Sequence, residues 1–415
     1  MPSTLSLSRL AIFAVLAAIS LPWLQSRQYT LSLLFKNKPE NLPEINAFSS
    51  SSLKFTDKPG LRNCEDGIVV PEDGFAILSC DPGRDLWNTV MGTFYHDHGK
   101  IPNGKLWLYN YALDFDAAPG TEGENEDEHE NQTEEKIVQQ IHFTDTPPNF
   151  SFHPLGIDLH RASSTLFVAN HAIDGSRLEV FILDTNGRIP VARYVKSILH
   201  PLLPGPNSLI ALSEHELYVT NDHYILRRKW SLGALFETYA GIPGGTVVYV
   251  NLNEEKEVVE MRNVARGPFA NGVALVNETT VAVAVTAAAE VRLYKRTGDS
   301  GLTYLKAIRM PFLPDNLATE KNGSLLIAGH PHPPSLDKTV HERRACIGAD
   351  GVVPKECWKS TAPSWVARWS EDKGVESLYI TASEFGSSAT AAKDVGRNVG
   401  IVTGLYESGI LVWRE

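Results

Sequence analysis

Short apolar or alternating segments, each ended by Gly, Pro, Asn or Asp, recur along most of this chain. Alternation with a period of two and termination by turn residues predict β-strands, and no long stretch with a period of 3.6 competes with them. The sequence therefore predicts an all-β fold. The expected strands cover 74–79, 104–111, 165–171, 178–183, 216–223, 245–252, 280–285, 290–296, 324–330, 364–370 and, as a closing group, 399–415.

Several of these strands belong to a recurring unit, in which an apolar strand is followed by a polar end and a second strand. The units beginning at 165, 216, 280 and 324 share this form, and insertions at 112–140 and 331–362 stretch the repeat. An interval of roughly fifty residues is typical of propeller blades. Six units favour a six-bladed β-propeller, although counting leaves five or seven blades open. The C-terminal strands are expected to close the ring against the first blade.

The chain divides into a possible targeting segment (1–26), a linker or N-terminal extension (27–60) and the propeller (61–415). Leu10–Leu24 is apolar and follows Arg9, as in a signal peptide or signal anchor. The segment is shorter than the roughly 17 to 25 residues of a membrane span. Cleavage and membrane anchoring both remain open, and a buried helix is the alternative. We expect passage through the secretory pathway, with the propeller secreted or membrane-anchored on the lumenal or extracellular side.

Cysteines and glycosylation motifs fit that compartment. Cys346 and Cys357 flank a Gly- and Pro-containing loop, at about 341–360, and are predicted to pair, while Cys64 and Cys80 are a candidate second pair. Connectivity cannot be deduced from spacing alone. Because no CxxC motif occurs, a zinc site is not expected. Asn-x-Ser/Thr motifs begin at Asn131, Asn149, Asn277 and Asn322.

The formal charge of −11 is unevenly distributed. Eight acidic residues fall within 122–135, inside an acidic insertion at about 117–136 that we interpret as a solvated segment. The remainder of the chain is nearly balanced in charge. Nucleic-acid binding, which needs a basic face, is not expected.

Six acidic or amide residues occur in four short motifs next to apolar strands. Oxygen ligands without thiolate or imidazole spacing suit calcium, which takes six to eight oxygens. Each motif alone also fits a turn, since Asn-Gly and Asp-Asn favour turns. The inner strands of a propeller meet at its axis, so the four motifs together predict a calcium site there. The residues are Glu65, Asp66, Asn207, Asn271, Asp315 and Asn316.

Over about residues 60–415 the chain resembles the paraoxonase/arylesterase family of calcium-dependent lactonases, and more distantly the gluconolactonase and regucalcin propellers. The segments that carry the resemblance are the acidic pair after Cys64, HPLGI (153–157), LFVANH (166–171), 202–225 with TNDHY, FANGV (269–273) and LPDNLA (313–318). The resemblance implies a catalytic calcium that polarises the carbonyl of a lactone or ester for attack by water. Its implied ligands are Glu65, Asn207, Asn271, Asp315 and Asn316.

The resemblance also implies a second, structural calcium and a histidine base, and this chain departs from both. The structural ion would use Asp66, the carbonyl of Ile157 and an acidic residue, but the last position is occupied by neutral Ser208. The usual base position is occupied by Leu155, which cannot accept a proton.

His171, His153 and Asp315 are the candidates to take over proton transfer, with His223 as a further imidazole. His330 and His332 could line the mouth of the pocket. Two other outcomes are that only activated substrates react, or that catalysis is lost.

Two hypotheses of function follow. The first is a calcium-dependent hydrolase of neutral, fairly apolar lactones or aryl esters. The second is a non-catalytic, calcium-stabilised propeller that binds a ligand or partner. A serine hydrolase is not expected, because no GxSxG motif occurs, and no nucleotide cofactor is implied.

Overall fold

A computed structural model of the chain describes residues 21–116, 136–348 and 354–415. Most of the apolar targeting segment, the acidic insertion with Asn131, and the tip of the disulfide loop lie outside the described residues.

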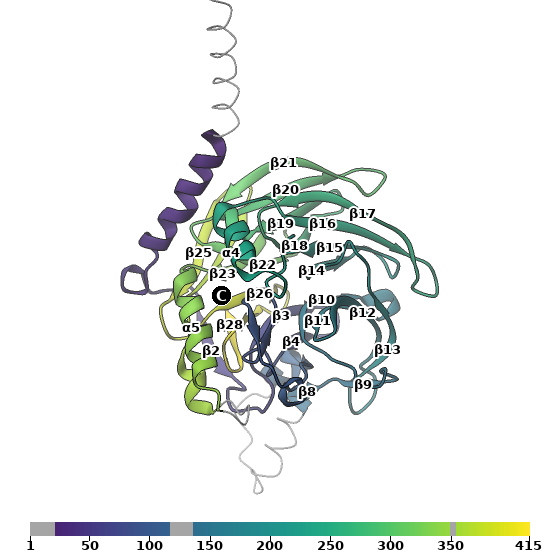
Figure 1. Cartoon of the computed structure of the whole chain (residues 1–415). Coiled ribbons are helices and arrows are strands. Elements are labelled where there is room, and N and C mark those ends of the chain that lie inside the picture. The colour runs from purple at the N-terminus through teal and green to yellow at the C-terminus, as the bar shows by residue number, and fades with distance from the viewer. Residues whose placement is uncertain (1–20, 117–135, 349–353) are drawn as a thin grey trace, which may run out of the picture.

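The described residues form six sheets of four or five strands, arranged around a central axis (Figure 1). This arrangement confirms the six-bladed β-propeller. In chain order the sheets are β3-β4-β7-β8, β10-β11-β12-β13-β9, β14-β15-β16-β17, β18-β19-β20-β21, β22-β23-β24-β25-β1 and β26-β27-β28-β2, and β5-β6 form a separate ribbon.

Most of the predicted strands are present in the structure, with boundaries shifted by at most a few residues. Four have the predicted boundaries, namely β16, β19, β20 and β24. The bounds are β1 Ile45–Asn46, β2 Ser50–Lys54, β3 Cys64–Val70, β4 Phe75–Cys80, β5 Trp87–Asn88, β6 Thr93–Phe94, β7 Lys105–Tyr109, β8 Val138–Gln140, β9 His142–Thr144, β10 Pro154–His160, β11 Thr165–Ala172, β12 Gly175–Asp184, β13 Val191–Ile198, β14 Pro206–Ala211, β15 Glu216–Asn221, β16 Gly245–Leu252, β17 Val258–Gly267, β18 Ala270–Asn277, β19 Thr280–Val285, β20 Glu290–Arg296, β21 Leu302–Arg309, β22 Leu313–Thr319, β23 Leu325–His330, β24 Ser364–Ser370, β25 Gly374–Thr381, β26 Ser388–Asp394, β27 Val399–Gly404 and β28 Ile410–Arg414.

The ring is closed by both ends of the chain. The C-terminal sheet packs against β3 of the first blade, as expected, and its outer strand is the N-terminal β2, which pairs with β28. In the preceding blade, β1 pairs with β25 at the outer edge. The region 27–60, predicted as a linker or extension, therefore contributes strands to two blades and covers two sheet edges.

The core lies between neighbouring sheets. Phe167 and Leu178 of the second sheet, for example, pack with Leu217 and Val248 of the third, and all four are fully buried. Burial of such side chains contributes roughly 1.5 to 3 kcal/mol each. The strands are consequently apolar on both faces, which explains why several of them read as continuous apolar runs.

Two helices lie outside the sheets: α4 (Ser231–Ala240), between β15 and β16, and α5 (Pro333–Ala345), at the left of the view in Figure 1. Sequence periodicity did not predict them. Gly241, with a φ of 64°, ends α4 in the left-handed region that glycine tolerates. The shorter elements are α2 (Tyr111–Asp116), η1 (Pro39–Asn41), η2 (His98–Lys100), η3 (Arg161–Ser163), η4 (Thr286–Ala288) and η5 (Lys355–Lys359).

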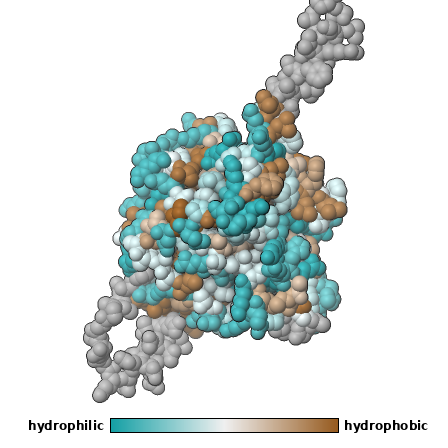
Figure 2. Space-filling view, turned by 90° about the vertical axis from the view of Figure 1, so that its left-hand side faces the viewer, coloured by the Kyte–Doolittle hydropathy of each residue, from teal (hydrophilic) through white to brown (hydrophobic). Residues whose placement is uncertain are grey.

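A further helix covers 21–36 and docks on the propeller. Trp23 Nε1 donates to the carbonyl of Ala240, and the hydroxyl of Tyr29 donates to the carbonyl of Met310. Hydrophobic surface borders the grey N-terminal segment in Figure 2, and Leu21 and Leu24 are about half exposed there, at 54% and 50%. Among the described residues, no helix combines the length and apolarity needed to cross a membrane.

Both predicted cysteine pairs form disulfides. Cys64–Cys80 joins β3 to β4 directly before Glu65, and Cys346–Cys357 joins the end of α5 to η5. The first bridge ties a predicted calcium ligand to the sheet, and the second ties down the helix beside the central pocket.

Candidate metal centre and pocket

The inner strand of every sheet contains a bulge. Pairing registers shift between Cys64 and Asp66 in β3, and at the corresponding places of β10, β14, β18, β22 and β26. A bulge re-aims side chains that would otherwise alternate across the sheet. Most predicted ligands lie inside these bulges, namely Glu65, Asn207, Ser208, Asn271, Asp315 and Asn316.

Glycines let neighbouring inner strands approach each other closely at the bulges. A Cβ on Gly272 of β18 would lie 2.6 Å from the Cα of Asn316 in β22. A Cβ on Gly156 of β10 would lie equally close, at 2.6 Å, to the carbonyl oxygen of Asn207 in β14. Side chains at these positions would push the strands apart, so the glycines allow the ligand-bearing strands to converge.

Across the described ranges, four buried side-chain oxygens from four different inner strands have no hydrogen-bond donor. They are Glu65 Oε2, Asn207 Oδ1, Asn271 Oδ1 and Asn316 Oδ1. Leaving a buried acceptor unsatisfied costs about 1 to 3 kcal/mol. Glu65, Asn207 and Asn271 line the same pocket, and Asn316 is hydrogen-bonded to Glu65. A hard cation, which accepts mixed carboxylate and amide oxygens, would explain these unpartnered acceptors. The donor set therefore fits calcium.

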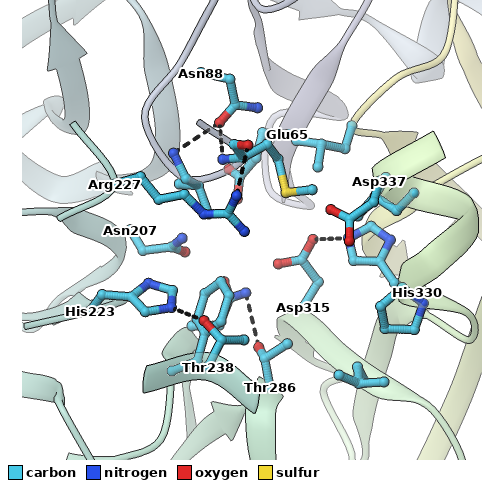
Figure 3. A pocket seen from close by; sticks show the side chains of 18 of the residues that line it. Glu65, Asn88, Asn207, His223, Arg227, Thr238, Thr286, Asp315, His330 and Asp337 are labelled. Carbon is cyan, nitrogen blue, oxygen red and sulfur yellow. Dashed lines mark hydrogen bonds and ion pairs between the residues drawn. The ribbon is translucent and has the colours of Figure 1, made fainter. Parts of the chain in front are cut away.

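Hydrogen bonds on the amide nitrogens orient these oxygens. Asn271 Nδ2 donates to Thr286 Oγ1 at 3.1 Å, and Asn316 Nδ2 donates to Glu65 Oε1 at 3.1 Å. With the nitrogen end of each amide occupied, the oxygen end is left for another partner. Figure 3 shows Glu65, Asn207 and Asp315 around one space, with Thr286 below them.

The charge of the site also favours a cation. Burial raises the pKa of Glu65 well above its usual range, and the neighbouring Asp66 and Asp315 raise it further. Grouped carboxylates that share little solvent repel one another unless a positive charge lies between them. Among the described residues, His, Cys, Asp and Glu side chains alone do not assemble a metal site in groups of three or more. Amide oxygens would have to complete the coordination.

His330, at the end of β23, joins this centre from outside the predicted ligand set. Its Nε2 lies 3.0 Å from Asp315 Oδ2, whereas its buried Nδ1 has no partner. The imidazole lines the same pocket as Glu65 and Asp315. If Nε2–H donates to Asp315, the lone pair of Nδ1 remains free to accept a proton. This histidine was expected only at the mouth of the pocket.

His171 and His153 occupy different surroundings. His171 Nε2 lies 2.8 Å from the carbonyl oxygen of Pro206, its Nδ1 contacts Thr89, and burial lowers its pKa to about 4. Both ring nitrogens are therefore engaged. His153 Nδ1 lies 3.1 Å from Asp81, and its Nε2 is buried without a partner. Neither imidazole lines the central pocket, so this geometry favours His330 over both.

The residues predicted to bind the structural calcium have hydrogen-bond partners within the protein. Asp66 Oδ1 accepts from the N–H of Gly67 and the hydroxyl of Thr390, and Oδ2 accepts from the N–H of Ile157 at 2.9 Å. Ser208 Oγ accepts weakly from the N–H of Val273. The oxygens of Asp66 thus already have protein donors. The Asp66 carboxylate is therefore satisfied without a cation, unlike the unpartnered oxygen of Glu65.

The pocket above the centre encloses about 110 Å³ and is mostly apolar. Leu155, where the sequence resemblance led us to expect a histidine, is buried and contributes to this wall, as do Phe269 and Leu313. Pro333 and Leu336 of α5 form the far side. Tyr239 of α4 donates its hydroxyl to Asp337 of α5 at 3.3 Å, which links the two helices at the mouth.

Sequence reasoning missed two cationic residues of this wall, Arg84 and Arg227. Both come from loops whose path is set by tertiary contacts. Arg227 lies shortly after the TNDHY segment, so the residues that follow this motif could have been considered as pocket residues. His223 of the same motif is held by Thr238 and Asp222, in agreement with a supporting role.

Comparison with known proteins gives one matching family. The arylesterase family model matches residues 122–342, just over half of the chain. Serum paraoxonase/arylesterase 2 of Bos taurus is 31% identical over 190 residues, which is 45% of this chain and 51% of that protein. Serum paraoxonase/lactonase 3 of Homo sapiens is 30% identical over 191 residues, covering 45% and 51%. The chain spans about half the length of the curated relatives it matches.

Solved structures with similar architecture include a luciferin-regenerating enzyme, with 12% identity, a TM-score of 0.49 and coverage of 88% of this chain and 95% of that one. Another is a regucalcin from Agrobacterium tumefaciens, with 11% identity, a TM-score of 0.45 and coverage of 90% and 95%.

Proposed function

This chain belongs to the arylesterase (paraoxonase) family, and from that premise we propose that it is a calcium-dependent hydrolase of lactones or aryl esters. The observation that carries the proposal is the set of four buried, unpartnered oxygens donated by four inner strands beneath an apolar pocket.

Calcium would be held by Glu65, Asn207, Asn271, Asp315 and Asn316. When bound, it would supply a Lewis acid that polarises the substrate carbonyl. The protein's own contribution is to hold these oxygens in place before the ion arrives. The bond from Asn316 Nδ2 to Glu65 Oε1 and the bond from Asn271 Nδ2 to Thr286 support this role.

The proton of the attacking water would pass to His330 Nδ1. Asp315 Oδ2, 3.0 Å from Nε2, favours the tautomer with the proton on Nε2 and would stabilise the imidazolium that forms. Imidazole is suited to this step because its ordinary pKa lies near neutrality. In this proposal His330 replaces the imidazole that Leu155 cannot provide, in preference to His171 or His153.

The apolar wall would bind the body of the substrate and exclude bulk water. Leu155, Phe269, Leu313 and Leu336 line it, so an aryl or alkyl group would find contacts on several sides. Water exclusion strengthens the electrostatic interactions around the carbonyl.

The test is hydrolysis of a panel of lactones and aryl esters by the purified protein with calcium and with a chelator. We expect turnover that is lost on chelation and restored by calcium. Hydrolysis that is insensitive to the chelator would contradict the calcium site, and no hydrolysis of any substrate would contradict the enzyme.

A non-catalytic, calcium-stabilised binding propeller is the second candidate, and the observation that favours it is Leu155 in place of an imidazole. In that case calcium would raise the melting temperature, while every ester and lactone in the panel would remain intact.

A secretory-pathway location, with the propeller secreted or membrane-anchored through its N-terminal segment, is also a proposal. Two disulfides support it, since such bonds persist in oxidising compartments. Glycosylation at Asn149, Asn277 or Asn322 is expected in that case. Treating the protein from a secreting cell with an endoglycosidase should reduce its mass, and an unchanged mass would contradict glycosylation.

A further inference from the structure

The central pocket has two guanidinium groups in an otherwise mostly apolar wall. Arg84 is only 2% exposed, and it donates from Nε and Nη2 to the backbone carbonyls of Asn63 and Pro154. Arg227 donates from Nη1 to the carbonyl of Met91 at 3.2 Å. Among the described residues, neither arginine forms an ion pair with a carboxylate.

Arg227 differs from an arginine with a purely structural role elsewhere in the fold. Arg343 of α5 uses Nε, Nη1 and Nη2 in hydrogen bonds and pairs with Asp85. Within the described part of the chain Arg227 makes one hydrogen bond, and Figure 3 shows its side chain reaching into the space beside Asn88 and Asn207. Its remaining donors are available to a ligand.

Three carboxyl groups share the pocket with these cations, and they differ in how they are engaged. Glu65 and Asp315 are assigned to the metal centre. Asp337, at the mouth, accepts a hydrogen bond from Tyr239, and burial raises the pKa of its carboxyl despite the opposing effect of Arg227. The pocket is thus lined by two guanidinium groups and three carboxyl groups, and with Glu65 and Asp315 holding calcium, Asp337 is the remaining carboxyl that faces the two arginines.

We propose that Arg227, aided by the charge of Arg84, binds an anionic group of the substrate, so that the preferred substrates are lactones or esters whose apolar body carries a carboxylate. This inference rests on the proposed hydrolase function and narrows its substrate class. It differs from the neutral substrate expected from the apolar walls and Leu155 alone. A carboxylate paired with a guanidinium gains charge-assisted hydrogen bonds that a neutral group cannot form.

Binding is tested first, without turnover. Calorimetry of the calcium-loaded full chain compares octanoate with octanamide, which has the same alkyl chain but no charge. We expect octanoate to bind about tenfold or more tightly than octanamide. Arg227→Gln should abolish this preference, and Asp337→Asn should increase it by removing a competing charge. Arg228→Gln is the matched control, because Arg228 is exposed and does not line this pocket.

A preference for octanoate that persists in Arg227→Gln would overturn the proposal, because the carboxylate would then be bound elsewhere, for example at the metal. Equal binding of octanoate and octanamide by the unmodified protein would also overturn it.

Measuring the hydrolysis of two esters tests this inference separately from the proposed function. The substrates are the phenyl ester of octanoic acid and the phenyl monoester of octanedioic acid, which differ by a terminal carboxylate. We expect a higher kcat/KM for the monoester, and loss of that ratio in Arg227→Gln. Hydrolysis of both esters without preference would overturn the inference and leave the hydrolase intact. Arg227-dependent binding of octanoate without hydrolysis would overturn the hydrolase alone.

Discussion

Asn316 illustrates how one side chain prepares the metal centre. Its Nδ2 donates both to the carboxylate and to the backbone carbonyl of Glu65, at 3.1 and 3.2 Å, and its Oδ1 has no donor. The two bonds fix Glu65 relative to Asn316, although β3 and β22 are far apart in sequence. A ligand set that is held in place before binding loses less conformational entropy when an ion arrives.

For His330→Gln we expect a fall in kcat of about 10² to 10⁴ fold, because the amide cannot accept the proton of water. Stabilisation by calcium should persist, since His330 is not in the ligand set. Steady-state kinetics and thermal melts measure the two effects. His332→Gln is the control, because His332 contacts Ser335 and does not line the pocket. A normal kcat in His330→Gln would place the base elsewhere.

His171 predicts a pH dependence of stability. Burial lowers its pKa from 6.5 to about 4, so the folded state favours the neutral ring. The unfolded chain takes up a proton first as the pH falls. The stabilisation is therefore present above about pH 6.5 and is lost between about pH 6.5 and 4, amounting to about 3 kcal/mol.

The comparison is urea unfolding of the unmodified protein and of His171→Gln between pH 7.5 and 4.5. We expect the free energy of unfolding to fall more steeply with decreasing pH in the unmodified protein. If the free energy of unfolding falls equally with pH in both proteins, His171 does not cause the pH dependence of stability.

Helix α5 forms one wall of the pocket, and the buried Arg343 helps to anchor it in addition to the Cys346–Cys357 disulfide. Arg343 pairs with Asp85, which also pairs with Arg62, and donates to the carbonyls of Trp358, Ser360 and Tyr406. Because Asn63, directly before Cys64 and Glu65, also contacts Arg343 and Asp85, the same network joins α5 to the strand that bears Glu65. The helix and the ligand strand are therefore mechanically coupled.

Arg343→Met should reduce the free energy of unfolding by about 3 kcal/mol or more, because it leaves a buried carboxylate with one of its two partners. KM should rise as well, since Leu336 on the same helix lines the pocket. Arg344→Met, which alters an exposed neighbour on the same helix, should change neither quantity. Equal behaviour of the two variants in urea titrations and kinetics would contradict the anchoring role.

Two features link distant parts of the ring: strand pairing at its outer edge and the proposed metal centre at its axis. At the edge, β1 and β2 complete two sheets, so the N-terminal region and the C-terminal strands stabilise each other. At the axis, Glu65, Asn207 and Asn271 of three inner strands line the central pocket, and Asn316 of a fourth is bonded to Glu65. A cation at that space would link blades that are otherwise joined mainly by packing between neighbours.

Chelation should therefore lower the melting temperature of the whole protein in one cooperative transition. At a calcium concentration a hundred times the Kd, the ion should add about 2.7 kcal/mol to the free energy of unfolding. Differential scanning calorimetry at several calcium concentrations measures the shift. Magnesium is the control, since its smaller, stricter octahedral shell suits an amide-rich cage less well. A melting temperature that does not change with the calcium concentration would contradict a stabilising calcium site.

The sequence by itself predicted the all-β fold, many of the strands, a six-bladed ring as the favoured count, both cysteine pairs as candidates and the acidic and amide residues proposed for the centre. These are local properties: alternation, turn residues and short motifs report their structure without knowledge of distant contacts. The strand TVAVAV (280–285), for example, was recognisable from its run of β-branched and apolar residues shortly after the turn-favouring Asn277.

Only the tertiary structure decided which of these residues meet, and how. It joined the N–H of Ile157 to Asp66, engaged both nitrogens of His171 and, within the described residues, left His330 Nδ1 without a partner. It also placed α4, α5 and Arg227 around the pocket. Bulges, hydrogen-bond partners and loop paths depend on strands that are far apart in sequence, so no local pattern encodes them.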